Sequence, residues 1–200
     1  MPNNEKNILE NNPTLDAVKS KFGESLLKSE VFRNELTLYI KRESIAEIMA
    51  FLKNDSDLAY DMLNDVTVVD GLIMEKNPRF QVVYHLRSTK YNRRLRIKAP
   101  VPENDCKIAT VSHLWKLADW AEREAYEMYG VTFEGHPDLR RVLMYEEFEG
   151  HPLRKDYPAN KAQPLVPYRE GTHDKLGPFL QDEGMPLNRS VSIDERVDPN

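Results

Sequence analysis

Three strand-like runs follow one another in the middle of the chain and constrain its fold more than any other feature. They begin at Val66, Arg79 and Arg93 and read VTVVDGLIM, RFQVVYHLR and RRLRIKA. Only the short breaks Asn77-Pro78 and STKYN separate them, and breaks of this length are typical of β-hairpins. The sequence therefore predicts an antiparallel sheet, not a sheet of strictly alternating strands and helices.

Helical and strand patterns precede these runs. Thr14 is placed as the N-cap of a helix over about 15–28, whose apolar residues recur at three- and four-residue steps. The run ELTLYIK, from Glu35, alternates apolar and polar residues as a half-buried strand does. Ser44 with Glu47 forms a capping-box pattern at the start of a second helix.

A short helix is expected near residues 58–63, and a longer helical pattern runs through SHLWKLADWAEREAYEMYG to a C-cap at Gly130. Two helices, hairpin-linked strands and a further helix predict an α+β fold. In this fold an antiparallel sheet has helices packed on one side, followed by a long extended C-terminal tail.

The periodicity stops after Gly130. The following residues are rich in proline and in charged side chains, over a length far beyond that of an ordinary loop. We therefore expect two parts, an α+β domain over residues 1–130 that includes the last helix and an extended docking tail over 131–200. Such a tail is either disordered or ordered by lying on another surface.

Composition excludes several classes of function. The chain has 200 residues and a net charge of −5, whereas a general nucleic-acid binder needs a clustered basic surface. The single cysteine, Cys106, leaves no internal disulfide and no cysteine-built metal site within this chain. The sequence contains no glycine-rich nucleotide-binding motif and no pattern of a signal peptide. It also contains no apolar run long enough to span a membrane.

A repeated pentapeptide, FEGHP, occurs at 133–137 and again at 148–152. His136 and His151 suggest a pair of metal ligands, but no HExxH or Glu-x-x-His motif accompanies them. Each copy also joins an aromatic residue to a turn and to following leucine and basic residues. This combination favours a docking segment, because arginine and aromatic side chains are enriched at interfaces.

Charged residues of the last helix have two interpretations. Asp119 with Arg123, and Arg123 with Glu127, are spaced as ion pairs on an exposed helix face, which we favour over acid–base catalysis. A run of basic residues in the third strand is typical either of a solvated edge strand or of a face turned toward an acidic partner. These residues are Arg93, Arg94, Arg96 and Lys98.

The segment WAEREAYEMYGVTFEGHPDLRRVLMYEEFEGHPLRKDYP, from Trp120 to Pro158, resembles the signature region of the 30 kDa-type subunit of respiratory complex I, the proton-pumping NADH:quinone oxidoreductase. The resemblance implies a structural subunit of the peripheral arm that docks on the large subunit at the quinone site. It further implies that FMN, iron–sulfur clusters and quinone belong to partner subunits, and that the chain lies peripherally on the cytoplasmic side of the cell inner membrane.

The resemblance implies no catalytic, cofactor-binding or metal-binding residue in this chain. The residues expected to carry the signature and partner docking are Glu122, Arg123, Glu124, Glu127, Phe133, His136, Arg140, Arg141, Phe148, His151, Arg154, Lys155 and Tyr157. Two alternatives remain open. One is the equivalent subunit of a membrane-bound hydrogenase or of a ferredoxin- or F420-linked quinone reductase. The other is a free-standing metal-dependent hydrolase that uses His136, His151 and Asp156.

Overall fold

The structure is a computed structural model that describes residues 12–74 and 78–164. Contacts divide the chain into two units. Among described residues, the first unit holds everything up to Met144 together with His151–Asp156, and the second holds Tyr145–Gly150 and the residues from Tyr157 on. The division expected at residue 130 stays a prediction, and most of the expected tail, 165–200, lies outside the described residues.

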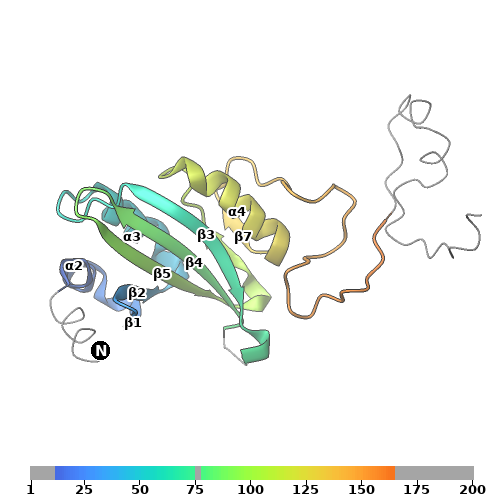
Figure 1. Cartoon of the computed structure of the whole chain (residues 1–200), viewed down its shortest axis with the longest axis horizontal. Coiled ribbons are helices and arrows are strands. Elements are labelled where there is room, and N and C mark those ends of the chain that lie inside the picture. The colour runs from blue at the N-terminus through green and yellow to red at the C-terminus, as the bar shows by residue number, and fades with distance from the viewer. Residues whose placement is uncertain (1–11, 75–77, 165–200) are drawn as a thin grey trace, which may run out of the picture. The chain divides into compact units, whose positions relative to one another are not determined.

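A five-stranded sheet forms the centre of the first unit (Figure 1). Its order is β1-β2-β5-β4-β3, and the strands are β1 (Leu26–Phe32), β2 (Glu35–Ile40), β3 (Met62–Asp70), β4 (Phe80–Ser88) and β5 (Arg93–Val101). All neighbours are antiparallel except β2 and β5, which run parallel. The α+β class with a mostly antiparallel sheet is therefore confirmed, and one parallel pairing joins the N-terminal hairpin to the three predicted strands.

Three α-helices share one hydrophobic core with this sheet. They are α2 (Pro13–Phe22), α3 (Ile45–Asn54) and α4 (Lys116–Tyr129), and α4 packs along the edge strand β3 (Figure 1). On β5, buried residues alternate with partly exposed ones, which shows that one face of the sheet is covered by the core. None of the helices in the described residues is long and apolar enough to cross a bilayer.

Short elements complete the first unit. The 3₁₀ turns are η1 (Gly23–Ser25), η2 (Arg42–Ser44), η3 (Leu72–Met74) and η4 (Glu103–Asp105). A separate parallel pair, β6 (Lys107–Ala109) and β7 (Thr132–Glu134), lies on either side of α4 in the sequence. Because β6 precedes α4 and β7 follows it, the pairing of these two strands fixes the chain at both ends of α4.

Two predictions for the N-terminal region were wrong. The helix expected over 15–28 ends at Phe22, and Leu26 begins β1, which pairs with β2 through a two-residue turn at Arg33 and Asn34. Both turn residues have positive φ, as a type I′ hairpin requires, so sheet pairing prevails over helical spacing here. The N-cap is Asn12, not Thr14.

The capping box and the short helix are also absent from the described structure. Ser44 makes no cap hydrogen bond, and its hydroxyl instead lies 2.8 Å from that of Ser25. No helix forms over 58–63, because Leu58 and Tyr60 are buried in irregular chain and β3 already begins at Met62. Burial of these large side chains in the core explains their apolar spacing without a helix.

Candidate functional site

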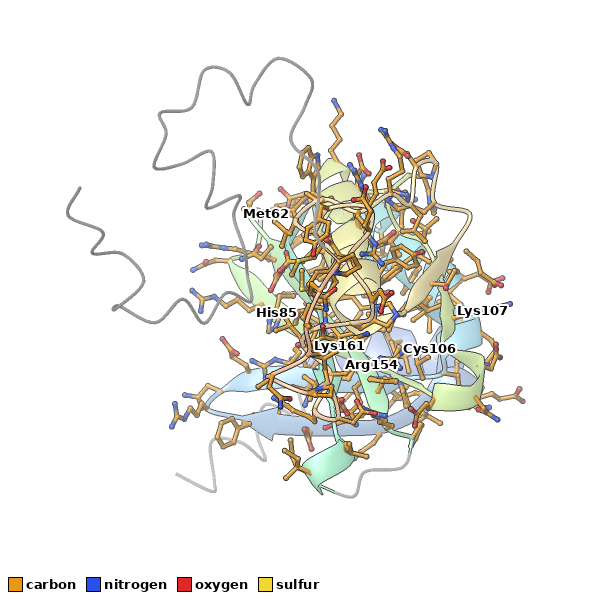
Figure 2. All side chains as sticks on the ribbon, turned by 90° about the vertical axis from the view of Figure 1, so that its right-hand side faces the viewer. Met62, His85, Cys106, Lys107, Arg154 and Lys161 are labelled. Atoms are coloured by element: carbon orange, nitrogen blue, oxygen red, sulfur yellow. The ribbon has the colours of Figure 1, made fainter. Side chains whose placement is uncertain are left out.

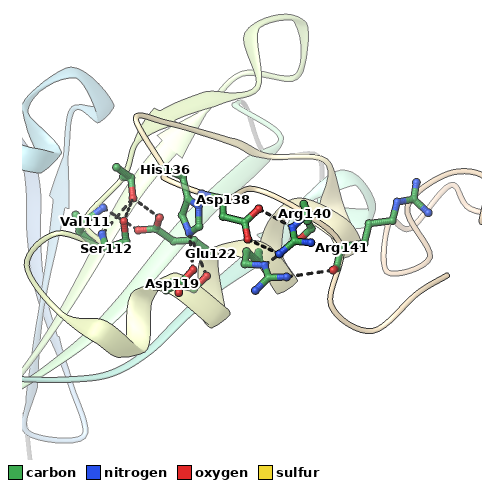
Figure 3. Close-up of polar contacts among 10 residues, drawn as sticks. Val111, Ser112, Asp119, Glu122, His136, Asp138, Arg140 and Arg141 are labelled. Atoms are coloured by element: carbon green, nitrogen blue, oxygen red, sulfur yellow. Dashed lines mark hydrogen bonds and ion pairs between the residues drawn. The ribbon is translucent and has the colours of Figure 1, made fainter. Parts of the chain in front are cut away.

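The signature helix α4 is covered from two sides by other parts of the first unit. It ends where predicted, with Gly130 in the left-handed conformation at φ +78° and its N–H bonded to the Tyr126 carbonyl. Residues 138–144 and 151–156, here called the clasp, contact the helix by side chains and backbone. Figure 3 shows the first part of the clasp passing along α4.

Glu127 holds the first part of the clasp through successive backbone amides. Its carboxylate is buried and accepts N–H bonds from Val142 at 2.8 Å, Leu143 at 2.9 Å and also from Met144. Hydrogen bonds to a charged acceptor are stronger than those between neutral groups. Glu127 therefore fixes the direction of the chain over residues 142–144.

Arg123 adds a second attachment one turn earlier. Its guanidinium donates to the carbonyls of Arg140 at 3.0 Å and Arg141 at 3.3 Å (Figure 3). The same guanidinium lies 5.3 Å from the centroid of the Trp120 ring, a cation–π distance. Arg123 thus uses backbone carbonyls of the clasp instead of the expected carboxylates on its own helix.

Glu122 and Glu124 have opposite environments. Glu122 is completely buried and accepts bonds from the Val111 N–H and the Thr110 hydroxyl. Burial raises the pKa of Glu122 to about 7. Glu124 is exposed. The interpretation of this cluster as one outer charged face is therefore wrong for Glu122 and for Glu127.

The two repeated histidines occupy different positions in the first unit. The His136 side chain is fully buried and its Nδ1 accepts the Asp138 N–H, so Nε2 is the nitrogen that donates to the Asp119 carbonyl at 3.2 Å (Figure 3). His151 donates from Nδ1 to the Glu127 carbonyl at 2.8 Å, and burial lowers its pKa. Phe133, which opens the first repeat, is a buried residue of β7.

The second part of the clasp occupies the C-terminal end of α4. A helix leaves its last carbonyls without intrahelical partners. Here the carbonyls of Glu127, Met128 and Tyr129 accept bonds from His151, from the Leu153 N–H and from Arg154, respectively. Arg154, labelled in Figure 2, makes its bond through Nε at 2.6 Å, and its positive charge at this end also suits the helix dipole.

Gly130 leaves room for this arrangement, which gives a direct test. A Cβ at Gly130 would lie 2.6 Å from His151 Nε2 and 2.7 Å from Arg154 Nη2, at a φ that side chains disfavour. Gly130→Ala is expected to lower the free energy of unfolding by about 1–3 kcal/mol. Urea denaturation measures this. Gly23→Ala is the control, since Gly23 has a right-handed helical conformation and open space around it. Equal losses of unfolding free energy in the two variants would contradict the close approach of His151 and Arg154 to Gly130.

Asp70 and Arg79, which the sequence did not single out, anchor the end of the clasp on the sheet. Arg79 is nearly buried and donates twice to Asp70, at 2.8 and 2.9 Å, and twice to Asp156, at 2.7 and 3.1 Å. A further bond of 2.6 Å joins Arg79 to Glu103. Asp70 also accepts the Lys155 N–H at 2.9 Å, so the expected docking residue Lys155 is held by its backbone.

Of the remaining predicted residues, Phe148 and Tyr157 belong to the second unit, Arg140 is exposed, and Arg141 is a partly buried residue of the first unit. Phe148 stacks on Tyr157 with ring centroids 6.2 Å apart, and Tyr145 meets Phe148 edge-on at 5.8 Å. Arg140 is exposed and pairs with Asp138 at 2.7 Å. The partner contacts of all these residues stay predictions.

The metal-dependent alternative finds little support in this geometry. Among the described residues, no group of three His, Cys, Asp or Glu side chains is arranged to hold a metal ion. His136 contacts Asp119, His151 contacts a helix carbonyl, and Asp156 pairs with Arg79. Each proposed hydrolase residue is thus engaged in a separate structural contact.

Comparison with known proteins extends this geometry to a family. The family model described as the 30 Kd subunit of respiratory-chain NADH dehydrogenase matches residues 38–163, which include α4 and the clasp. A Geobacter metallireducens protein, named as a subunit of NADH-quinone oxidoreductase, is 52% identical over 151 residues, covering 76% of this chain and 91% of the relative. The chain belongs to this family.

One further relative and two solved structures are also similar to this chain. A Roseiflexus sp. protein of the same name is 39% identical, over 87% of this chain and 99% of its own length. A solved trypsin-resistant fragment of Nqo5 is 32% identical with a TM-score of 0.56, covering 63% of this chain and 99% of the fragment. The fold is also similar to a chain of an archaeal membrane-bound sulfane sulfur reductase, at 22% identity, a TM-score of 0.58, and coverage of 78% of this chain and 84% of that one.

Proposed function

We propose that this chain is a structural subunit of the peripheral arm of a proton-translocating NADH:quinone oxidoreductase, and that it docks on the large quinone-site subunit. Its membership in the 30 Kd subunit family carries this proposal. In this role the chain supports electron transfer from NADH to quinone without taking part in the chemistry. Its place is then peripheral, on the cytoplasmic side of the cell inner membrane.

We further infer that FMN, the iron–sulfur clusters and quinone are held by partner subunits. The sequence supports this because it contains one cysteine, Cys106, whereas a cysteine-ligated cluster needs several. Burial raises the pKa of the Cys106 thiol, which disfavours the thiolate that binds metals. The chain therefore contributes contacts and shape, and its partners contribute the redox centres.

Exposed apolar side chains on α4 and the clasp support docking through this surface. Trp120 is 63% exposed, Leu143 62% and Leu153 47%, although Trp120 lies within α4 and the N–H groups of Leu143 and Leu153 are bonded within the unit. Large exposed apolar residues on a fixed backbone are suited to an interface, because little conformational entropy is lost on binding. We propose that these three side chains contact the large quinone-site subunit.

Affinity purification from the native host tests this proposal. A tagged chain, extracted gently from membranes, is expected to bring down cluster-bearing subunits and inhibitor-sensitive NADH:quinone activity. Trp120→Ser is expected to reduce partner recovery about tenfold or more, as for a central interface aromatic. Phe32→Ser is the control, because Phe32 is 60% exposed at the sheet edge, away from α4 in the strand order.

The outcomes separate the alternatives. Recovery of a hydrogenase, or of a quinone reductase linked to another electron donor, would assign the chain to a related complex. Recovery of the chain alone with a stoichiometric metal that is lost in His136→Ala would favour the hydrolase. Equal partner recovery for the two serine variants would show that the interface lies elsewhere.

A further inference from the structure

The carboxyl group of Glu122 is buried without a compensating cation. None of its surface is exposed, and its donors among the described residues are both neutral, the Val111 N–H at 2.8 Å and the Thr110 hydroxyl at 2.5 Å. Within the part of the chain that the structure describes, no Lys, Arg or His forms an ion pair with Glu122. A buried carboxylate in such a setting favours its neutral form.

The titratable groups that face Glu122 strengthen this preference. Asp119 lies one turn earlier on α4 and acts as a like charge, and its Oδ1 is 3.2 Å from His136 Nε2 in the segment after β7. Tyr84 on β4 is completely buried, and burial together with the charge of Glu122 raises its pKa. The Tyr84 hydroxyl has no hydrogen-bond partner among the described residues. None of these elements brings a positive charge to Glu122 itself.

Two hydroxyl groups connect Glu122 to the surface. Thr110 Oγ1 lies 2.5 Å from Glu122 Oε2 and 2.8 Å from Ser112 Oγ. Ser112 lines a surface cavity of about 520 Å³ together with His113, Lys116 and Trp120. The Thr110 hydroxyl has one hydrogen. This hydrogen is donated to Glu122 when the carboxyl is ionised, and it is free to be donated to Ser112 when a protonated carboxyl donates to Thr110.

We propose that Glu122 is a proton-binding site that exchanges its proton with the surface cavity through Thr110 and Ser112. Its charge state then sets how tightly the segment 110–112 is held against α4. The Val111 N–H is retained in both states, whereas the Thr110 bond reverses its direction. This site lies within the fold of the chain and does not depend on which partner the chain binds.

Carbon-detected NMR of the full-length chain, labelled with ¹³C at glutamate side chains, tests the site directly. The Glu122 carboxyl signal, assigned by its loss in Glu122→Gln, is expected to titrate with a midpoint near pH 7. Thr110→Val should raise this midpoint, because it removes a hydrogen bond to the charged form. Thr37→Val is the matched control, because Thr37 is also a buried threonine but its hydroxyl accepts from Arg96 on β5. A wild-type midpoint below pH 5, or one unchanged in Thr110→Val, would overturn the proposal.

Stability against pH gives a second readout that needs no signal assignment. The pKa of Glu122 is higher in the folded state than its ordinary 4.5, so the folded chain binds the proton more tightly and stability falls as pH rises toward 7. Between pH 5.5 and 8.5 the folding equilibrium constant should fall about 30-fold more in the wild type than in Glu122→Gln. Urea denaturation at both pH values measures the difference, and equal falls would overturn the proposal.

Discussion

Replacing Arg79 with methionine is expected to lower the free energy of unfolding by about 3–5 kcal/mol. The change leaves the carboxylate of Asp70, whose side chain is fully buried, without its cation, and it releases Asp156 and Glu103 at the same time. The pair holds the pKa of Asp70 well below its usual range, so its loss is costly at neutral pH. Urea denaturation at pH 7 measures the effect.

Proteolysis shows whether the same change frees the clasp. In Arg79→Met, trypsin should cut sooner after Arg154 and Lys155, because Asp156 loses its bonds to the sheet. Arg94→Met is the matched control, since Arg94 is a strand arginine in an exposed pair with Glu35 and should cost less than about 1 kcal/mol. If Arg79→Met and Arg94→Met lowered the free energy of unfolding equally, the buried ion pairs of Arg79 would contribute no more stability than an exposed pair.

Glu127→Ala is expected to lower the free energy of unfolding by about 2–4 kcal/mol. It removes one carboxylate that accepts hydrogen bonds from three backbone amides of the clasp, so all three amides lose this charged acceptor at once. Amide hydrogen exchange should accelerate most at Val142, Leu143 and Met144, and urea denaturation gives the loss of stability.

Glu124→Ala on the same helix is the control for this prediction. Glu124 is exposed and carries the same charge, so its removal should change stability by less than about 0.5 kcal/mol. Glu127→Gln should fall between the two, because its amide keeps one acceptor oxygen. If exchange at 142–144 were unchanged in Glu127→Ala, the carboxylate would not be what holds the clasp.

The local parts of the fold follow from the sequence, and the distant pairings do not. Period-two alternation located β4 and β5, and the C-cap glycine located the end of α4. Strand β1 was missed because helical spacing over 15–28 competes with a hairpin whose turn has no glycine. The parallel pairing of β2 with β5 depends on register between remote segments, which no local pattern encodes.

The contacts that the signature residues make within the fold could not be predicted from the sequence. Glu122 and Glu127 are five residues apart, so they point about 140° apart around the helix. Both are buried, because segment 110–112 covers one side of α4 and the clasp covers another. A one-sided amphipathic pattern cannot indicate this. Asp70 and Arg79 were missed because opposite charges at a hairpin end are common, and only the folded clasp brings Asp156 to Arg79 as well.

The parallel pairing of β2 with β5 has a consequence for the order in which the sheet is completed during synthesis. Thr37 pairs with Arg96, 59 residues later, so the first hairpin emerges from the ribosome before its neighbour exists. At roughly 5–20 residues per second this delay lasts several seconds. Over that time Leu36, Leu38 and Ile40 lack the strands β4 and β5 that complete their core, so we expect the nascent hairpin to expose apolar side chains of the kind that chaperones bind.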